Sequence, residues 1–254
     1  MNINFKNKTV FISGASSGFG LLITKKMAEL GATLLLVDKQ SDSLKKVSKQ
    51  LEDNGTKVMA LSCDVSNEHD VSNTFDQFME KFGRIDIAIN NAGIINSMNR
   101  IADCPFDDFK KVIEVNLSGC FLCLKQQIKH MLPKKKGVIL NVASVSGLIG
   151  SPFLGPYSAS KHGVIGLTKT AAAEYGRKGL RVNAICPTFA STPMLDDITK
   201  GKDEKFKEQL YANIPMQRLA EPEEVVNVMI MLCSEYNTYM NGAEIPVDGG
   251  LTAV

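Results

Sequence analysis

Short apolar runs alternate along the chain with stretches whose apolar positions repeat at helical spacing. Seven such runs predict β-strands: Thr9–Ser13, Thr33–Val37, Lys57–Ser62, Ile85–Ile89, Val138–Val142, Arg181–Ile185 and Glu244–Val247. The stretches between them predict helices, for example Leu21–Leu30, Leu44–Leu51 and Val71–Phe82. Several strands are apolar at every position, which is typical of strands covered by helices on both faces. The pattern therefore predicts an α/β fold with a doubly wound, seven-stranded parallel sheet, Rossmann-like, in a three-layer αβα arrangement.

The chain of 254 residues shows no linker, repeat or low-complexity segment, so we expect one domain over residues 1–254. The segment 191–215 stands out, because apolar Met194 and Leu195 precede a charged stretch, 200–205. Two interpretations fit this composition. The segment is either a mobile helical lid over a substrate site or an ordinary surface helix.

Charge and hydropathy exclude several classes of protein. The formal net charge is +2 and charges of both signs alternate along the chain, unlike the basic footprint of a nucleic-acid binder. No window approaches the roughly 18 uninterrupted apolar residues of a membrane span. The first residues lack the apolar stretch of a signal peptide. We expect a soluble, cytoplasmic protein with no nucleic-acid or membrane partner.

The cysteines and histidines predict no metal site. Six cysteines are scattered over the chain, mostly in apolar runs, which indicates reduced, buried thiols. Cys120 and Cys123 form a CxxC, but no second CxxC follows and the residues between them are apolar within a helical pattern. We interpret this pair as part of a helix core.

A glycine-rich turn follows the first predicted strand and leads into a helix. Its small residues let the backbone approach a pyrophosphate, and the start of the helix supplies free N–H groups and a positive dipole end. A tight connection would also use glycine, but strand, turn and helix occur in the order that nucleotide binding requires. The residues expected to hold the phosphates are Gly14, Ser16, Ser17, Gly18, Phe19 and Gly20.

The ends of the next strands carry further candidate cofactor contacts. Asp38 ends the second strand, where a carboxylate accepts hydrogen bonds from ribose hydroxyls and repels a 2′-phosphate. Lys39 could instead pair with that phosphate. Because Asp38 is better placed and the glycine-rich turn holds no basic residue, we expect NAD, with NADP less favoured. Asp64, Val65 and Asn91 follow the third and fourth strands and add to the predicted cofactor site.

Tyr157 and Lys161 are four residues apart at the start of an Ala-rich helical run, so their side chains share a helix face. A phenol has an ordinary pKa of about 10, and a nearby cation lowers that pKa by favouring the phenolate. Such a pair can exchange a proton during alcohol–carbonyl interconversion. A Tyr and a Lys on a solvated helix face can also have this spacing. Whether the pair is catalytic therefore has to be judged from the motifs in the rest of the chain.

Nearly the whole chain resembles the short-chain dehydrogenase/reductase family, of the single-domain type with ~250 residues. The resemblance rests on an ordered set of motifs: Gly14-x3-Gly18-x-Gly20, Asp64, Asn90-Asn91-Ala92-Gly93, Asn116, Ser144, Tyr157-x3-Lys161, Pro187 and Val247-Asp248-Gly249-Gly250. Tyr157 lies thirteen residues beyond Ser144, as in the family pattern.

The resemblance implies a catalytic tetrad of Asn116, Ser144, Tyr157 and Lys161. Tyr157 would exchange the proton with the substrate oxygen, and Ser144 would hydrogen-bond the same oxygen. Lys161 would lower the pKa of Tyr157 and hydrogen-bond the nicotinamide ribose. Asn116 would hold a water that connects Lys161 to solvent.

Near the nicotinamide, the resemblance implies contacts from Pro187 and from the hydroxyl of Thr192. Two positions depart from the family pattern. Ser13 replaces a common Thr and keeps a hydroxyl, whereas Thr188 replaces a usual Gly and could narrow the pocket. Neither change removes a catalytic group.

The predicted activity is NAD-dependent hydride transfer between a secondary alcohol and its ketone. Phe153, Leu154, Met194 and Leu195 indicate an apolar pocket, hence an apolar, cyclic or hydroxysteroid-like alcohol. An NADPH-dependent 3-oxoacyl thioester (acyl-carrier-protein) reductase is the alternative, and a non-enzymatic binding protein with the same fold is a third. The resemblance also implies a homotetramer.

Overall fold

The computed structural model describes residues 3–254 and contains one seven-stranded parallel sheet, in the order β3-β2-β1-β4-β5-β6-β7. The strands are β1 (Thr9–Ser13), β2 (Thr33–Asp38), β3 (Val58–Ser62), β4 (Ile87–Asn90), β5 (Gly137–Val142), β6 (Leu180–Pro187) and β7 (Glu244–Val247). All neighbouring pairs are parallel. The predicted fold class is confirmed. β6 runs two residues further than predicted and so carries Pro187 at its end.

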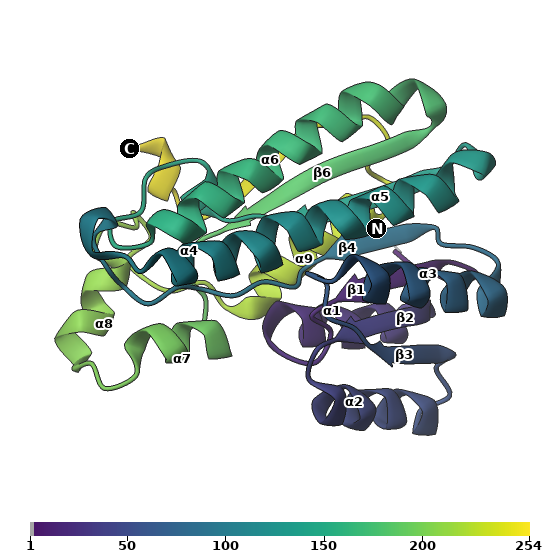
Figure 1. Ribbon diagram of the computed structural model, residues 1–254, viewed down its shortest axis with the longest axis horizontal. Helices are drawn as coiled ribbons and strands as arrows, with labels where there is room; N and C mark the ends of the chain where they lie inside the picture. Colours follow the sequence, from purple (N-terminus) through teal and green to yellow (C-terminus); the bar gives the residue numbers. More distant parts are fainter. Residues whose placement is uncertain (1–2) are drawn as a thin grey trace.

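Helices cover both faces of this sheet (Figure 1). They are α1 (Gly18–Glu29), α2 (Ser41–Asp53), α3 (Glu68–Phe82), α4 (Phe106–Ile113), α5 (Gly119–Met131), α6 (Gly155–Tyr175), α7 (Pro193–Thr199), α8 (Glu204–Tyr211) and α9 (Pro222–Cys233). One apolar cluster packs α1, α2 and α9 on one face, and a second packs α3, α5 and α6 on the other. None of the helices in residues 3–254 combines the length and the apolar character needed to cross a lipid bilayer.

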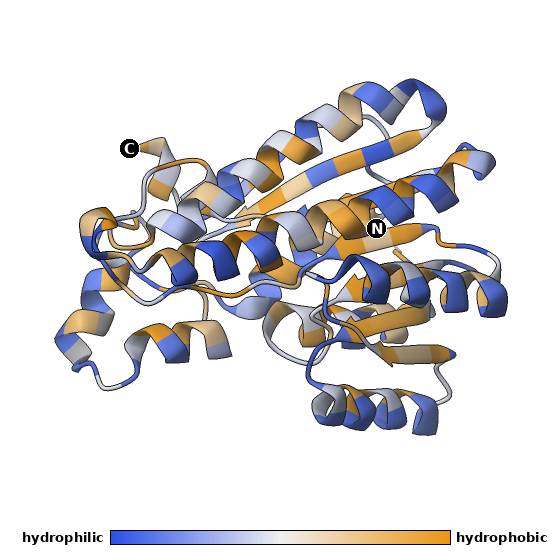
Figure 2. Cartoon of the chain, in the orientation of Figure 1, coloured by the Kyte–Doolittle hydropathy of each residue, from blue (hydrophilic) through white to orange (hydrophobic). Residues whose placement is uncertain are grey.

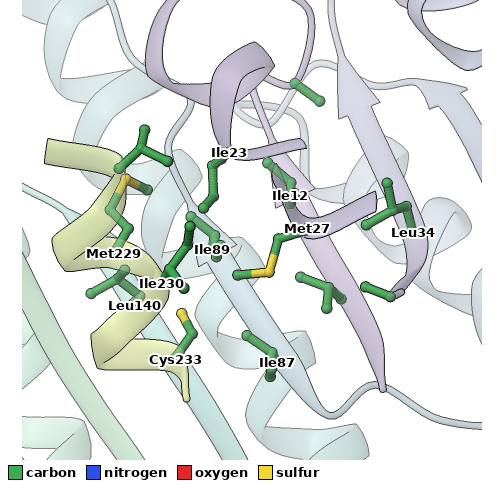
Figure 3. Packing of buried hydrophobic residues seen from close by; sticks show 14 of the residues in the cluster. Ile12, Ile23, Met27, Leu34, Ile87, Ile89, Leu140, Met229, Ile230 and Cys233 are labelled. Carbon is green, nitrogen blue, oxygen red and sulfur yellow. The ribbon is translucent and has the colours of Figure 1, made fainter. Parts of the chain in front are cut away.

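Figure 3 shows how the first cluster closes over the sheet. Ile23 and Met27 of α1 and Met229 of α9 point toward strand residues such as Ile12 and Ile89, and all five side chains are fully buried. In Figure 2 the strands are largely hydrophobic, whereas α2 and α3 alternate between hydrophobic and hydrophilic residues. This difference is expected when strands are covered on two faces and outer helices on one.

Local signals set the ends of individual helices. Asn67 precedes α3, and its side chain accepts hydrogen bonds from the backbone N–H groups of His69 and Asp70. Gly83 ends the helix in the left-handed conformation with φ of 64°. The helix therefore starts three residues before the predicted Val71 and ends at the predicted Phe82.

The cysteines lie in the core. Within residues 3–254 all six are free thiols, and five of them are buried, with Cys104 half-buried. Cys120 and Cys123 lie on the inner side of α5, which confirms the prediction that this CxxC belongs to a helix core.

The order of the strands places a ligand site between β1 and β4. The chain builds β1, β2 and β3 in one direction, and then crosses back so that β4 pairs with the other side of β1. At such a switch point the connections after the two central strands diverge and leave a crevice at their carboxyl ends. The residues that follow Ser13 and Asn90 open onto this crevice.

A buried amide network ties the carboxyl ends of β4 and β5 to two helices. Asn90 and Asn141 are paired in register, and Asn90 Nδ2 donates to Asn141 Oδ1 at 2.8 Å. Gln127 of α5 exchanges two hydrogen bonds with Asn90, at 2.7 and 2.9 Å. Asn141 Nδ2 donates to Thr168 Oγ1 of α6 at 2.8 Å. These side chains are fully or almost fully buried, so every lost partner leaves an unpaired polar group.

We expect Gln127→Leu to lower the free energy of unfolding by about 1–3 kcal/mol, because Asn90 Oδ1 would lose its donor in the core. Gln126→Leu is the matched control, since Gln126 is a half-buried neighbour on the same helix outside the network. Its effect should stay within about 0.5 kcal/mol. Denaturant unfolding of both variants measures the difference, and equal losses would contradict the role of the network.

Candidate active site

The turn between β1 and α1 is tight enough to require glycine. Gly14 and Gly18 have φ of +63° and +50°, in the left-handed region that favours glycine. A Cβ atom on Gly20 would lie 1.9 Å from the Gly14 carbonyl oxygen and 2.5 Å from Asn91 Nδ2. The turn therefore packs directly against Asn91, as the nucleotide-binding interpretation of the sequence requires.

Ser13 joins the turn to the end of β4. Its hydroxyl oxygen accepts the backbone N–H groups of Asn91 and Ala92, both at 3.1 Å. Asn91 Nδ2 donates in return to the carbonyl oxygens of Ser13 and Gly14, also at 3.1 Å. These hydrogen bonds use only the hydroxyl group, which Ser13 supplies where the family commonly has Thr.

Asp38 is fixed against the glycine-rich turn. Its Oδ2 atom accepts the backbone N–H of Ser16 at 3.0 Å and the Ser16 hydroxyl at 2.7 Å. Its Oδ1 atom accepts the backbone N–H of Gln40 at 2.9 Å. The carboxylate predicted for the ribose hydroxyls is therefore held in a defined orientation at the end of β2.

The neighbouring cation is paired with a different carboxylate. Lys39 Nζ lies 2.6 Å from Asp64 Oδ2, and this hydrogen bond raises the pKa of Lys39. Partial burial would raise the pKa of Asp64, but hydrogen bonds from Lys39 and Ser66 outweigh it and the pKa is lowered. The next residue, Val65, is buried. It packs closely against Gly119 of α5, where a Cβ atom would lie 2.8 Å from the Val65 side chain.

Asn116 lies in a π-helical turn (Glu114–Ser118) between α4 and α5. Such turns are frequent at functional sites because the extra residue redirects a side chain. Asn116 Oδ1 accepts the backbone N–H of Ile94 at 2.8 Å, and Nδ2 donates to the Ile94 carbonyl at 2.9 Å and to Ser160 Oγ at 3.1 Å. In the structure Asn116 joins the segment after β4 to α6, while its predicted water contact stays a prediction.

Ser144 and Tyr157 approach each other from the turn after β5 and from the first turn of α6. Ser144 Oγ accepts the backbone N–H of Ser146 at 3.1 Å and donates to the Pro187 carbonyl at 3.4 Å. Asn96 Oδ1 accepts the backbone N–H of Tyr157 at 3.3 Å. Both predicted side chains are buried, with 8% of each residue exposed.

The electrostatics of Tyr157 differ from the sequence prediction. Burial raises the pKa of Tyr157 to about 12, although hydrogen bonding with Ser144 acts in the opposite direction. The prediction that Lys161 lowers this pKa below its ordinary value is wrong for the protein alone. Lys161 Nζ lies 5.5 Å from the centre of the Tyr157 ring and donates to the Val142 carbonyl at 2.7 Å. Burial in turn lowers the pKa of Lys161 to about 8.

One pocket collects seven of the predicted residues: Phe19, Asn91, Ser144, Tyr157, Lys161, Pro187 and Thr192. Its walls are mostly apolar, and they include Leu154, Met194 and Leu195 as predicted. Thr188 also lines the pocket. The remaining predicted cofactor residues lie outside its lining, in the adjoining turns: Gly14, Ser16, Ser17, Gly18, Gly20, Asp38, Asp64 and Val65. Gly18 faces the pocket side, since a Cβ atom there would lie 4.0 Å from Thr192 Cβ.

The segment 191–215 forms two helices that lie together at one end of the molecule (Figure 1). α7 lines the pocket through Met194, Leu195 and Ile198, whereas no described residue of α8 does so. Movement of this segment as a lid stays a prediction.

Sequence reasoning missed several apolar residues of the pocket, among them Ile95 and Leu251. Leu251 comes from the last turn of the chain, far in sequence from the other walls, and no local pattern marks it. Ile95 lies two residues after the Asn-Asn-Ala-Gly motif, and this proximity could have identified it as a pocket residue. Among the side chains that the structure describes, no group of three or more His, Cys, Asp or Glu residues is placed to hold a metal ion.

Comparisons with known proteins agree with this geometry. Residues 14–252 match the family model described as enoyl-(acyl carrier protein) reductase. The chain is 37% identical to meso-2,3-butanediol dehydrogenase from Serratia marcescens, over 99% of this chain and 97% of the relative. It is 36% identical to a 3-oxoacyl-[acyl-carrier-protein] reductase from Thermotoga maritima, over 98% and 99% of the two chains.

Among solved structures, the crystal structure of levodione reductase superposes with a TM-score of 0.95 at 36% identity, covering 99% of this chain and all of the other. The similarity to each of these proteins extends over almost the full length of both chains. The chain belongs to the short-chain dehydrogenase/reductase family and is an NAD(P)-dependent enzyme of the alcohol dehydrogenase and ketoreductase type.

Proposed function

We propose that the protein is an NAD-dependent oxidoreductase that interconverts a secondary alcohol and its ketone, with Tyr157 as the general acid and base. One observation carries this proposal: the Tyr157 phenol, the Ser144 hydroxyl and the Lys161 ammonium line the same largely apolar pocket. The two relatives named for butanediol and levodione support the substrate class, because one is a secondary alcohol dehydrogenase and the other a ketone reductase by name.

The residues of the chain fit a nicotinamide dinucleotide. The glycine-rich turn leaves no room for a Cβ atom at Gly20 and presents the start of α1, which suits a pyrophosphate. Asp38 supplies a fixed carboxylate for the adenosine ribose, and Phe19, Asn91, Pro187 and Thr192 lie at the pocket end. Lys161 and Tyr157 would hold the second ribose. When bound, the cofactor supplies the hydride acceptor or donor.

Tyr157 and Ser144 would act on the substrate oxygen. A phenol with a pKa of about 12 is neutral at physiological pH, so Tyr157 is ready to donate its proton to a carbonyl oxygen during reduction. In alcohol oxidation the same oxygen must accept a proton, so Tyr157 would react from its phenolate fraction, which grows as the pH rises. Ser144 donates to or accepts from the same substrate oxygen and stabilises its developing charge.

The choice of NAD follows from the pairing of charges near β2. Asp38 ends β2, where we expect a 2′-phosphate to approach, and Lys39 is engaged by Asp64. This arrangement of charges disfavours the 2′-phosphate that distinguishes NADP from NAD. The alternative function, NADPH-dependent reduction of a 3-oxoacyl thioester, draws support from the Thermotoga maritima relative, and the cofactor preference distinguishes the two.

Three further features stay proposals. We propose one domain over residues 1–254, a homotetramer and a cytoplasmic location. The first is supported by the single sheet through which every described strand pairs. The other two rest on the resemblance and on the sequence composition.

Tyr157→Phe should lower kcat by at least about 100-fold in both directions, because the general acid is lost. The Kd for NAD should change by less than about threefold, because the phenol oxygen makes few of the contacts with the dinucleotide. Tyr175→Phe is the matched control on the same helix, outside the pocket. Steady-state kinetics and NAD titration measure both effects, and normal turnover by the Tyr157→Phe variant would place the proton donor elsewhere.

The rate of alcohol oxidation should rise with pH. Between pH 6 and 7.5 the pKa values of about 12 for Tyr157 and about 8 for Lys161 leave the phenol protonated and the ammonium mostly charged. The phenolate fraction then grows by roughly tenfold per pH unit, so kcat/KM for oxidation should rise while kcat/KM for reduction stays nearly constant. Initial rates in both directions test this, and a falling oxidation rate over the same range would contradict it.

Asp38→Ala should shift cofactor preference toward NADP by at least about tenfold in the ratio of kcat/KM values, since a like charge beside the 2′-phosphate costs more than about 1.4 kcal/mol. Asp53→Ala serves as the control, because Asp53 is an exposed carboxylate at the far end of α2. An unchanged ratio in the Asp38 variant would show that another group selects the cofactor.

A further inference from the structure

The pocket contains a pair of hydroxyl groups that the proposed proton transfer does not use. Ser146 and Ser151 both line it, and Ser151 Oγ lies 2.7 Å from Ser146 Oγ in a direct hydrogen bond. Ser146 belongs to the short helical turn after β5, and only 5% of the residue is exposed. Ser151 lies on the loop that leads to α6.

The pair has hydrogen-bonding capacity left over. Each hydroxyl carries one proton and two acceptor lone pairs, and the bond between the two serines uses a single proton. Within the described part of the chain, the second proton of the pair has no acceptor. The two serines therefore offer one donor and several acceptor positions at the pocket wall, which suits a polar atom of a ligand.

The pair lies close to the proposed reacting centre. The backbone N–H of Ser146 donates to Ser144 Oγ at 3.1 Å. Because a serine hydroxyl is near its own backbone nitrogen, Ser146 Oγ and Ser144 Oγ are separated by at most roughly 7 Å. Two substrate oxygens on neighbouring carbons would fit this separation, one at Ser144 and Tyr157 and the other at the serine pair.

The rest of this wall is apolar and uncharged. Val145, Ile149 and Leu154 line the same pocket, and the ammonium of Lys161 is engaged by the Val142 carbonyl. A buried carboxylate or phosphate would lack a compensating cation here, so its desolvation would be costly. A neutral hydroxyl or carbonyl group incurs no such cost.

The loop holds Ser151 in place independently of this pair. The backbone N–H of Leu154 donates to the Ser151 carbonyl at 3.1 Å, and the backbone N–H of Ile149 donates to the Val145 carbonyl at 3.0 Å. Removal of one hydroxyl therefore need not release the loop, which allows the two serines to be tested by substitution.

We propose that Ser146 and Ser151 bind a second, uncharged oxygen of the substrate, on the carbon next to the one that is oxidised or reduced. The substrate class is then a vicinal diol, an α-hydroxyketone or the matching dione. This inference rests on the proposed function, because it requires Ser144 and Tyr157 to bind the first oxygen.

The test compares substrates that differ only in the second oxygen, with the full-length enzyme and NAD. Cyclohexane-1,2-diol is paired with cyclohexanol, and pentane-2,3-diol with pentan-2-ol. The wild-type kcat/KM should be at least about tenfold higher for each diol, because a site built for a hydroxyl rejects the analogue that lacks it. Ser146→Ala and Ser151→Ala should each lower the diol value by roughly tenfold and leave the mono-alcohol value within about twofold.

Ser158→Ala is the matched control, because Ser158 lies on α6 next to the site and outside the pocket lining. It should leave the diol preference unchanged. Equal loss on diol and mono-alcohol in the Ser146 and Ser151 variants would show that the pair only supports the loop. Loss of the preference in Thr188→Val, with none in the serine variants, would assign the second oxygen to Thr188 and overturn the proposal.

The outcomes separate this inference from the proposed function. Equal wild-type turnover of diols and mono-alcohols would contradict the inference alone. Failure of the wild-type enzyme to oxidise any alcohol, or to reduce any matching ketone, would contradict the proposed function as well.

Discussion

Burial of an ammonium group and a phenol one helical turn apart is the constraint on which the site depends. Lys161 is 4% exposed, and its charge is compensated by the Val142 carbonyl at 2.7 Å. This requires α6 to pack closely on the strand ends. A Cβ atom on Gly147 would lie 2.8 Å from the Lys161 carbonyl oxygen, and one on Gly93 would lie 3.6 Å from Lys161 Nζ. The close approach of the Lys161 backbone to the turn after β5 therefore requires glycine at position 147.

The same strand ends connect the proton-transfer residues to the nucleotide turn. Asn91 contacts the backbone of the turn, and two residues later Gly93 packs against Asn116 and Lys161. The buried amides of Asn90 and Asn141 hold β4 and β5 in register beneath both. A ligand that spans the crevice would therefore contact elements that are already fixed relative to one another, which lowers the entropic cost of aligning it.

The sequence predicted the sheet, the glycine-rich turn and the tetrad, because each depends on local periodicity or on ordered motifs. It could not predict the direction of the Tyr157 pKa, since burial by Val112, Leu154 and the surrounding loops arises only in the folded chain. The sequence also did not predict the π-helical turn at Asn116 or the ion pair between Lys39 and Asp64. The Lys39–Asp64 pair and the contribution of Leu251 to the pocket depend on how segments distant in sequence meet.

A crystal structure of the protein with NAD tests the central claim most directly, because the claim is that the turn, Asp38 and the Tyr157–Lys161 pair form one dinucleotide site. The account predicts the adenosine ribose within hydrogen-bond distance of Asp38 and the nicotinamide ribose within that distance of Tyr157 and Lys161. Density for the nicotinamide outside the pocket lined by Ser144 and Tyr157, or for the adenosine ribose away from Asp38, would contradict it.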